Sequence, residues 1–318
     1  MDVRQLTALV NVADNSSFSA AADALGTVQS NVSTHVARLE KELGAVLYDR
    51  LAGRLTAEGE VVVARARRVI AELQAISLDV AALTHEVSGS VRVGMIGTTA
   101  RWLAPRIVAL VPQRHPRVQL VVVEGTSTVL GPQLASGQLD LAVLNLPVPG
   151  HDVSAELLFE EELVLVVPAD DVLARRSEIS LAELTDLDLI LPIPGTAFRD
   201  ELDSACAPLG IRLRPRVEID GTRLIASLTF EGYGPAVLPA TAVPAFLRDE
   251  WRMVRVRDLP PRRVGVAQRT RGLLSAPARA LHGILHELVR EAQDMPDRLR
   301  PAPADADGNR RTSETGYA

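Results

Sequence analysis

A run of hydrogen-bonding side chains stands at the start of a helical pattern early in the chain. It consists of Gln29, Ser30, Asn31, Ser33 and Thr34. An amide side chain can pair bidentately with adenine, and a hydroxyl can hydrogen-bond to any base. Long charged side chains would instead bind DNA without distinguishing one base from another. Polar residues also cap and solvate ordinary helix starts. The stretch by itself therefore leaves base recognition and helix capping equally open.

Cations that could hold nucleic-acid phosphates are few. The formal net charge is −6, which argues against a sequence-blind nucleic-acid binder. Residues 1–58 contain more Asp and Glu than Lys and Arg. Contact with phosphates would rest on Arg38, Lys41, Arg50 and Arg54, together with the positive end of a helix.

Three short helices are predicted to position these side chains. The first spans about Val3 to Asp14, and the second is a short helix before Gly26, a residue suited to ending it. The third helix has one apolar stripe, formed by Val32, Val36, Leu39 and Leu43. This is the pattern of a helix-turn-helix, whose second helix enters the major groove. The segment 46–60 predicts a small β-wing that places Arg50 or Arg54 near the DNA backbone.

A long helix follows, from about Ala57 to Val87. Its apolar residues recur every 3.5 residues on average, as in a coiled coil: Val62, Ala66, Val69, Leu73, Ile76, Val80, Leu83 and Val87. We expect dimerisation through Val62, Val69, Leu73, Ile76, Val80 and Leu83. Packing of this helix on its own chain is the alternative.

Strand and helix patterns alternate after the hinge-like residues Ser88 to Ser90. The alternation predicts α/β layers with mostly parallel sheets, divided into two lobes with a ligand cleft between them. We predict four segments: a DNA-binding domain at 1–58, a dimerisation helix at 59–87, a two-lobed α/β domain at 88–295 and a disordered tail at 296–318.

Two other classes of protein fit the sequence less well. An enzyme is poorly supported, because no Gly-x-Ser-x-Gly or Gly-x-Gly-x-x-Gly follows a strand. His282 and His286 lie four residues apart on a predicted helix, which supplies half a metal site at most. A transport-type solute-binding protein would explain only the second domain. The single cysteine, Cys206, excludes an internal disulfide and is expected to be a small buried residue.

The chain resembles the LysR-type transcriptional regulators up to about Asp294. The resemblance rests first on amino-terminal motifs: Leu-x-x-Leu-Val-x-Val-Ala at Leu6 to Ala13, Ser-Phe-Ser-x-Ala-Ala at Ser17 to Ala22, Gln-Ser-Asn-Val-Ser at Gln29 to Ser33, Leu-Glu-x-Glu-Leu-Gly at Leu39 to Gly44 and Leu-Tyr-x-Arg at Leu47 to Arg50. It continues in Gly-Gln-Leu-Asp-Leu-Ala at Gly137 to Ala142, Glu-Glu-Leu-Val-Leu-Val-Val-Pro at Glu161 to Pro168 and Gly-Tyr-Gly-Pro-Ala-Val-Leu-Pro at Gly232 to Pro239.

The resemblance implies an α/β protein with a winged helix-turn-helix domain, a long linker helix and a two-lobed effector domain like that of periplasmic binding proteins. It implies DNA contacts by Gln29, Ser30, Asn31, Ser33, Thr34, Arg38, Arg50 and Arg54. It places a small-molecule effector near Thr98, Thr99, Thr126, Asn145 and Thr196, although a helix cap or turn is an equally good role for each singly.

The implied partners are an operator in double-stranded DNA, a second copy or three further copies of the chain, the effector and, for an activator, RNA polymerase. No cofactor, metal, membrane contact or catalysis is expected, and the protein is expected in the cytoplasm. Ser30 and Thr34 stand where many members have Pro and Arg, and the wing is short. These departures predict modest non-specific DNA affinity.

Overall fold

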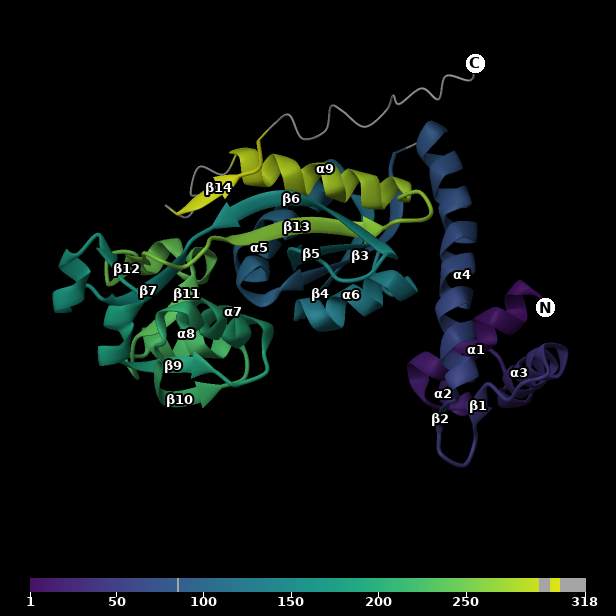
Figure 1. The fold of residues 1–318 in the computed structure, drawn as a ribbon. Coiled ribbons are helices and arrows are strands. Elements are labelled where there is room, and N and C mark those ends of the chain that lie inside the picture. Colours follow the sequence, from purple (N-terminus) through teal and green to yellow (C-terminus); the bar gives the residue numbers. More distant parts are fainter. Residues whose placement is uncertain (85, 292–297, 304–318) are drawn as a thin grey trace, which may run out of the picture.

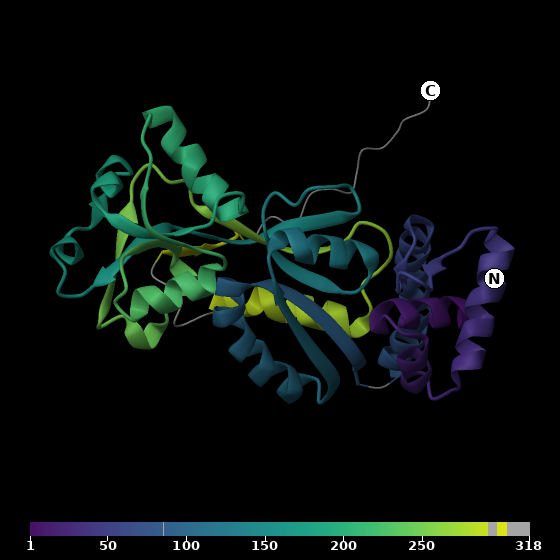
Figure 2. The ribbon, with the colours of Figure 1, turned by 90° about the horizontal axis from the view of Figure 1, so that it is seen from below.

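The computed structural model describes residues 1–84, 86–291 and 298–303 (Figure 1). Three parts follow one another along the chain: a small helical domain, one long helix and a two-lobed α/β region (Figures 1 and 2). The predicted fold class, a winged helix-turn-helix joined by a linker helix to a two-lobed α/β domain, is therefore confirmed. Among the described residues, no helix is both long enough and apolar enough to cross a membrane.

The amino-terminal domain consists of α1 (Val3–Asn15), α2 (Phe18–Ala24), α3 (Gln29–Leu43) and the paired strands β1 (Tyr48–Asp49) and β2 (Arg54–Leu55). The side chains of Asp2 and Ser17 cap α1 and α2 by accepting from backbone N–H groups. Val32, Val36 and Leu39 form the buried stripe of α3 as predicted. Leu43 is instead exposed, because α3 ends there and Gly44 turns the chain away with a φ of +66°.

The long helix α4 spans Ala57–Thr84. Its first turn lies against the wing so closely that a Cβ on Gly59 would sit 1.9 Å from the carbonyl oxygen of Leu47. Val63 and Ala66 are buried in the core of the helical domain. The near end of α4 is therefore fixed to α1 and the wing, while the remainder extends away from them (Figure 1).

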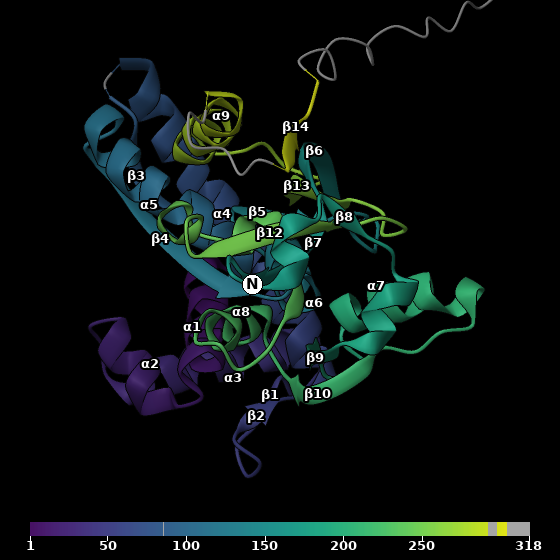
Figure 3. The same ribbon diagram turned by 90° about the vertical axis from the view of Figure 1, so that its left-hand side faces the viewer.

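Lobe I is built on a six-stranded sheet with the order β14-β6-β13-β5-β3-β4. Its strands are β3 (Ser88–Ile96), β4 (Arg117–Gly125), β5 (Leu141–Asn145), β6 (Val153–Glu161), β13 (Arg262–Arg269) and β14 (Leu299–Pro301), and its helices are α5 (Gly97–Arg114), α6 (Ser127–Ser136) and α9 (Ala276–Glu291). Helices α5 and α9 contact each other on one face of the sheet, and α6 covers the other face (Figures 1 and 3).

Lobe II contains a four-stranded sheet, β11-β7-β12-β8, and the parallel pair β9–β10. Its elements are β7 (Leu163–Pro168), β8 (Glu178–Ile179), β9 (Asp188–Pro192), β10 (Arg214–Ile219), β11 (Ala236–Pro239), β12 (Trp251–Val256), α7 (Ala197–Cys206), α8 (Thr222–Phe230) and the 3-10 turns η1 (Val172–Arg175), η2 (Ala182–Asp186), η3 (Ala207–Leu209), η4 (Ala240–Ala242) and η5 (Ala245–Leu247). Along β7, Leu163, Leu165 and Val167 join the core that contains α7 residues, whereas Val164 and Val166 join the core under α8. Strand β7 is therefore buried on both of its faces, and its successive side chains point alternately into the two cores.

Two sequence predictions about the second domain are wrong. The sheets are mixed and not mostly parallel, because β6 and β13 run antiparallel where they carry the chain to and from lobe II. Within the tail predicted to be disordered at 296–318, Leu299–Pro301 instead pair with β6 as an edge strand. Residues 296–297 and 304–318 of that prediction lie outside the described residues.

Candidate nucleic-acid interface and effector cleft

The polar residues at the start of α3 lie on its outer face. Gln29, Ser30, Asn31 and Thr34 are exposed, while the opposite side of the helix packs on α1 and α2. The Asn31 amide donates to the Thr27 hydroxyl at 3.0 Å, and the Thr34 hydroxyl donates to the Ser30 carbonyl at 2.8 Å. Both bonds are local and exposed, so either side chain can exchange its partner for a base edge.

The amino-terminal end of α3 leaves backbone donors available. Val28 is the N-cap residue and no side chain caps the helix. The first N–H groups of a helix have no partner inside it, and together with the helix dipole they attract anions. This end of α3 can therefore accept a phosphate beside the exposed amides and hydroxyls.

The wing carries two arginines, and one of them contacts α3. The Arg50 guanidinium donates to the Ser33 hydroxyl at 3.1 Å and lies 4.7 Å from the centre of the Phe18 ring. The turn between the strands is held by the Asp49 carboxylate, which accepts from the N–H groups of Leu51 and Ala52. Arg54 is exposed on β2. We name Arg50, Arg54 and the polar face of α3 together the α3–wing surface.

The seam predicted along α4 divides into two parts. Val62 is half-buried and packs against the helical core, together with the buried Ala66. Farther along, five residues of the seam are exposed in the single chain: Val69, Leu73, Ile76, Val80 and Leu83. Part of α4 therefore packs on its own chain, and Leu78 on another face of the helix adds a contact near Gly89.

The residues predicted for effector binding are not joined into one cluster. Thr98 and Thr99 are buried at the start of α5. Asn145 ends β5, and its backbone N–H donates to Ser127. Thr126 lies exposed before α6, and Thr196 caps α7 by accepting from the Arg199 N–H. Within the described chain, no hydrogen bond joins Thr126, Asn145 or Thr196 to Thr98 or Thr99.

An ion pair that the sequence did not reveal lies where the chain crosses between the lobes. Glu161 ends β6 and Arg262 begins β13, and both are almost fully buried. Arg262 Nε donates to Glu161 Oε1 at 2.9 Å, and its Nη2 donates to Thr98 Oγ1 at 2.8 Å. The second carboxylate oxygen of Glu161 accepts from the Thr241 N–H of η4 at 2.9 Å. The network therefore joins lobe I, the crossing strands and lobe II.

Unpaired polar groups flank this network on both sides. Thr99 Oγ1 and Thr241 Oγ1 are buried and make no hydrogen bond with the described chain. Glu201 of α7 also faces the network: burial raises the pKa of its carboxyl, Arg262 opposes that shift and Glu161 adds to it. A ligand atom that bonds to Thr99 or Thr241 would recover hydrogen bonds that the protein alone leaves unmade.

A hollow of about 230 Å³ lies on the same crossing strands. Glu160, Glu162, Arg255 and Arg298 line it with other residues. Arg298 pairs with Glu162 at 2.9 Å, and Arg263 pairs with Glu160 at 3.3 Å. Because its acids already have basic partners, this hollow offers a weaker electrostatic attraction for a charged ligand than its composition implies.

Comparison with known proteins assigns both parts of the chain. The family described as "Bacterial regulatory helix-turn-helix protein, lysR family" matches residues 3–60, and the "LysR substrate binding domain" matches residues 84–290. A probable hydrogen peroxide-inducible genes activator from Streptomyces viridosporus is 33% identical over 301 residues, covering 93% of this chain and 96% of that protein.

Two solved structures have the same arrangement. A variant of full-length OxyR from Pseudomonas aeruginosa superposes with a TM-score of 0.77 at 27% identity, covering 95% of this chain and 99% of that one. Full-length CbnR, solved in complex with its target DNA, gives a TM-score of 0.61 at 23% identity, covering 91% of this chain and 100% of that one. At 23% identity, the similarity to CbnR shows a shared fold and no more.

Proposed function

Because this chain belongs to the LysR family of transcriptional regulators, with a DNA-binding helix-turn-helix and an effector-binding domain, we propose specific roles for its residues on operator DNA. Gln29, Ser30, Asn31 and Thr34 contact base edges from the major groove. Arg38, Arg50 and Arg54 contact phosphates, and Ser33 holds Arg50 in position. The exposed polar face of α3 beside the wing is the observation that carries this proposal.

Loss of a base contact and loss of a phosphate contact are expected to change DNA binding in different ways. Loss of a base contact costs about 1–3 kcal/mol on the operator and little on unrelated DNA, whereas loss of a phosphate contact weakens both and lowers the log–log salt slope by about one. Asn31→Ala should therefore reduce specificity, and Arg54→Ala should reduce the salt dependence.

Footprinting on the DNA upstream of the chain's own gene, at two salt concentrations with competitor DNA, measures both quantities. Arg117→Ala, which removes an exposed cation in lobe I, is the control. Unchanged operator affinity in Asn31→Ala and Thr34→Ala, with complete loss in Arg54→Ala, would contradict the assignment of α3 to base reading.

We propose that two copies pair through the exposed part of the α4 seam. Leu73, Ile76 and Val80 recur at coiled-coil spacing, and a second copy would bury them. The dimer sets two α3–wing surfaces on a two-fold related operator, and two dimers form the tetramer in which effector binding changes their relative placement. A coupling of about 1–3 kcal/mol changes affinity by roughly 5–150-fold, which is enough for regulation. An activator would also contact RNA polymerase.

We infer that the effector is a small polar molecule bound at Thr98 and Thr99, and that the chain has no catalytic role. The similar proteins are named as regulators or activators, several of them as activators of hydrogen peroxide-inducible genes. Cys206 cannot form a disulfide within this chain, and burial raises the pKa of its thiol. A response to peroxide through an internal dithiol switch is therefore not open to this protein.

Two isosteric variants test the effector site. Thr99→Val removes the hydroxyl and keeps the shape, whereas Thr99→Ser keeps the hydroxyl. A thermal-shift screen of metabolites on the full chain identifies an effector, and footprinting measures its action on each variant. We expect Thr99→Val to lose the response and Thr99→Ser to retain it. An equal response in both would assign Thr99 a structural role.

A further inference from the structure

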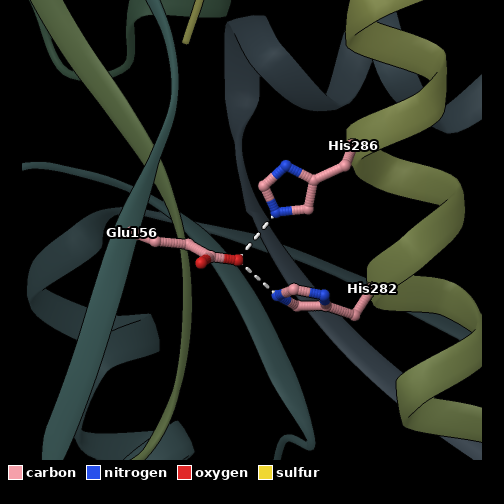
Figure 4. A group of neighbouring side chains, drawn as sticks. All are labelled: Glu156, His282 and His286. Carbon is pink, nitrogen blue, oxygen red and sulfur yellow. Dashed lines mark hydrogen bonds and ion pairs between the residues drawn. The ribbon is translucent and has the colours of Figure 1, made fainter. Parts of the chain in front are cut away.

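One cluster of ligating side chains takes no part in the sites described so far. His282 and His286 project from α9 toward Glu156 on β6 (Figure 4). The Nε2 atom of His282 lies 2.6 Å from Glu156 Oε1, and that of His286 lies 2.7 Å from the same oxygen. The sequence placed the two histidines four residues apart, and the fold supplies the third donor from a strand 126 residues earlier than His282.

The packing of α9 fixes the positions of the histidines. Residues four apart share one face of a helix, and the neighbouring Leu281, Ile284 and Leu285 are buried against the sheet of lobe I. The two imidazole rings are 4.8 Å apart between centroids. Their side chains are 27% and 23% exposed, so the donors are held by the core and remain open to solvent.

We propose that Glu156, His282 and His286 form a binding site for a divalent transition-metal ion, with Zn²⁺ as the best fit and solvent in the remaining coordination positions. Two imidazole nitrogens with one carboxylate oxygen are a ligand set used for zinc in proteins, and imidazole disfavours Mg²⁺ and Ca²⁺. The partial exposure provides a route for the ion and room for water.

The present geometry needs only small changes to accept the ion. The three donor atoms all lie within 4.8 Å of one another. Tetrahedral zinc with bonds of about 2.0–2.1 Å separates its donors by roughly 3.3 Å. Each histidine nitrogen must therefore move about half an ångström or more away from the carboxylate oxygen, and the two nitrogens must reach a similar separation from each other.

The donor chemistry favours the cation as well. An ordinary carboxyl is ionised at neutral pH, so Glu156 places a negative charge beside the two imidazoles. A neutral imidazole can hydrogen-bond to the carboxylate through Nε2–H. When the ion binds, the proton of each ring would move through solvent to Nδ1, which leaves the Nε2 lone pair for the metal. The competing interpretation is that the three side chains only form a hydrogen-bonded link between α9 and β6.

Calorimetric titration of Zn²⁺ into untagged, chelator-stripped full-length protein distinguishes these interpretations. We expect one ion per chain, with affinity at least about tenfold weaker in His282→Ala and in His286→Ala. His151→Ala, which removes an exposed histidine elsewhere in lobe I, should bind like wild type. No binding to the wild type, or equal affinity in the double variant His282→Ala/His286→Ala, would overturn the proposal.

A second measurement separates ligation from misfolding. Glu156→Gln keeps an oxygen that accepts hydrogen bonds from both histidines, so it should fold, yet it removes the anionic ligand. Zn²⁺ should raise the Tm of wild type and of His151→Ala by more than that of Glu156→Gln. Equal shifts in Glu156→Gln and wild type would show that the carboxylate is no ligand. DNA binding can be measured independently in the presence of chelator, so this proposal and the operator assignment fail separately.

Discussion

Truncation of Ile76 tests whether the exposed face of α4 is a dimer contact. Ile76 exposes 61% of its surface in the single chain and lies near the middle of the exposed seam. Ile76→Ala removes three carbons, which at about 0.8 kcal/mol per buried methylene amounts to about 2.4 kcal/mol for complete burial. Scaled by the exposed fraction, the loss is about 1.5 kcal/mol per copy.

The contact occurs twice in a two-fold dimer, so the variant should weaken dimerisation by about 3 kcal/mol. At 1.4 kcal/mol per decade, the Kd of the dimer rises roughly 100-fold. Sedimentation equilibrium over a range of protein concentrations measures this change directly. Circular dichroism should remain unchanged, because Ile76 contributes little to the core of its own chain.

Val172→Ala is the matched control. Val172 is 79% exposed in η1 of lobe II, so its truncation removes apolar surface of similar exposure away from α4. Its dimer Kd should equal that of wild type. A dimer Kd for Ile76→Ala within about threefold of wild type would refute dimerisation through this face of α4. The helix would then be a linker without a partner at this face.

Three further predictions concern lobe II and the crossing strands. Arg262→Met should lower the free energy of unfolding in urea by about 3–5 kcal/mol, because Glu161 is left buried without its counter-ion; Arg263→Met, which breaks an exposed pair, should cost far less. Burial raises the pKa of Glu201, so its ionised form is destabilising: Glu201→Gln should have a higher Tm than wild type at pH 7, and the difference should vanish as pH falls below about 4.3. Because the Cys206 thiol is buried, hydrogen peroxide should leave the operator footprint of wild type and of Cys206→Ser unchanged, and a tenfold loss of protection in wild type alone would show that this single thiol senses peroxide.

The helical domain could be predicted from sequence because its information is local. Val32, Val36 and Leu39 recur at helical spacing, and all three are buried. The exposed polar residues of α3 follow from the same periodicity. Periodicity does not predict the contact between Arg50 and Ser33, because that contact depends on how the wing folds back over α3.

The strand β6 shows why the rest escaped prediction. It contains Glu156, Glu160 and Glu161, which disfavour a buried strand when read alone. The partners that make these charges acceptable are distant in sequence: His282 and His286 for the first, and Arg262 for the last. The buried ion pair and the proposed metal site both depend on contacts of this strand with distant parts of the chain, so neither could be predicted from the sequence.

Consecutive residues on α4 connect the two halves of the molecule. Arg67 pairs with Asp14 at the end of α1, whereas the Nε of Arg68 donates to the Ala135 carbonyl of α6 at 2.9 Å. Three turns later, Asp79 accepts from the N–H of Ala276, the first residue of α9, at 2.9 Å. Helix α4 therefore touches both helical faces of lobe I and the DNA-binding domain.

A change of lobe I that shifts α6 relative to α9 must either move α4 or break one of these bonds, and movement of α4 displaces α1 through Arg67. Effector binding thus has a route to the α3–wing surface within a single chain, and pairing through the α4 seam would couple that displacement to the second copy.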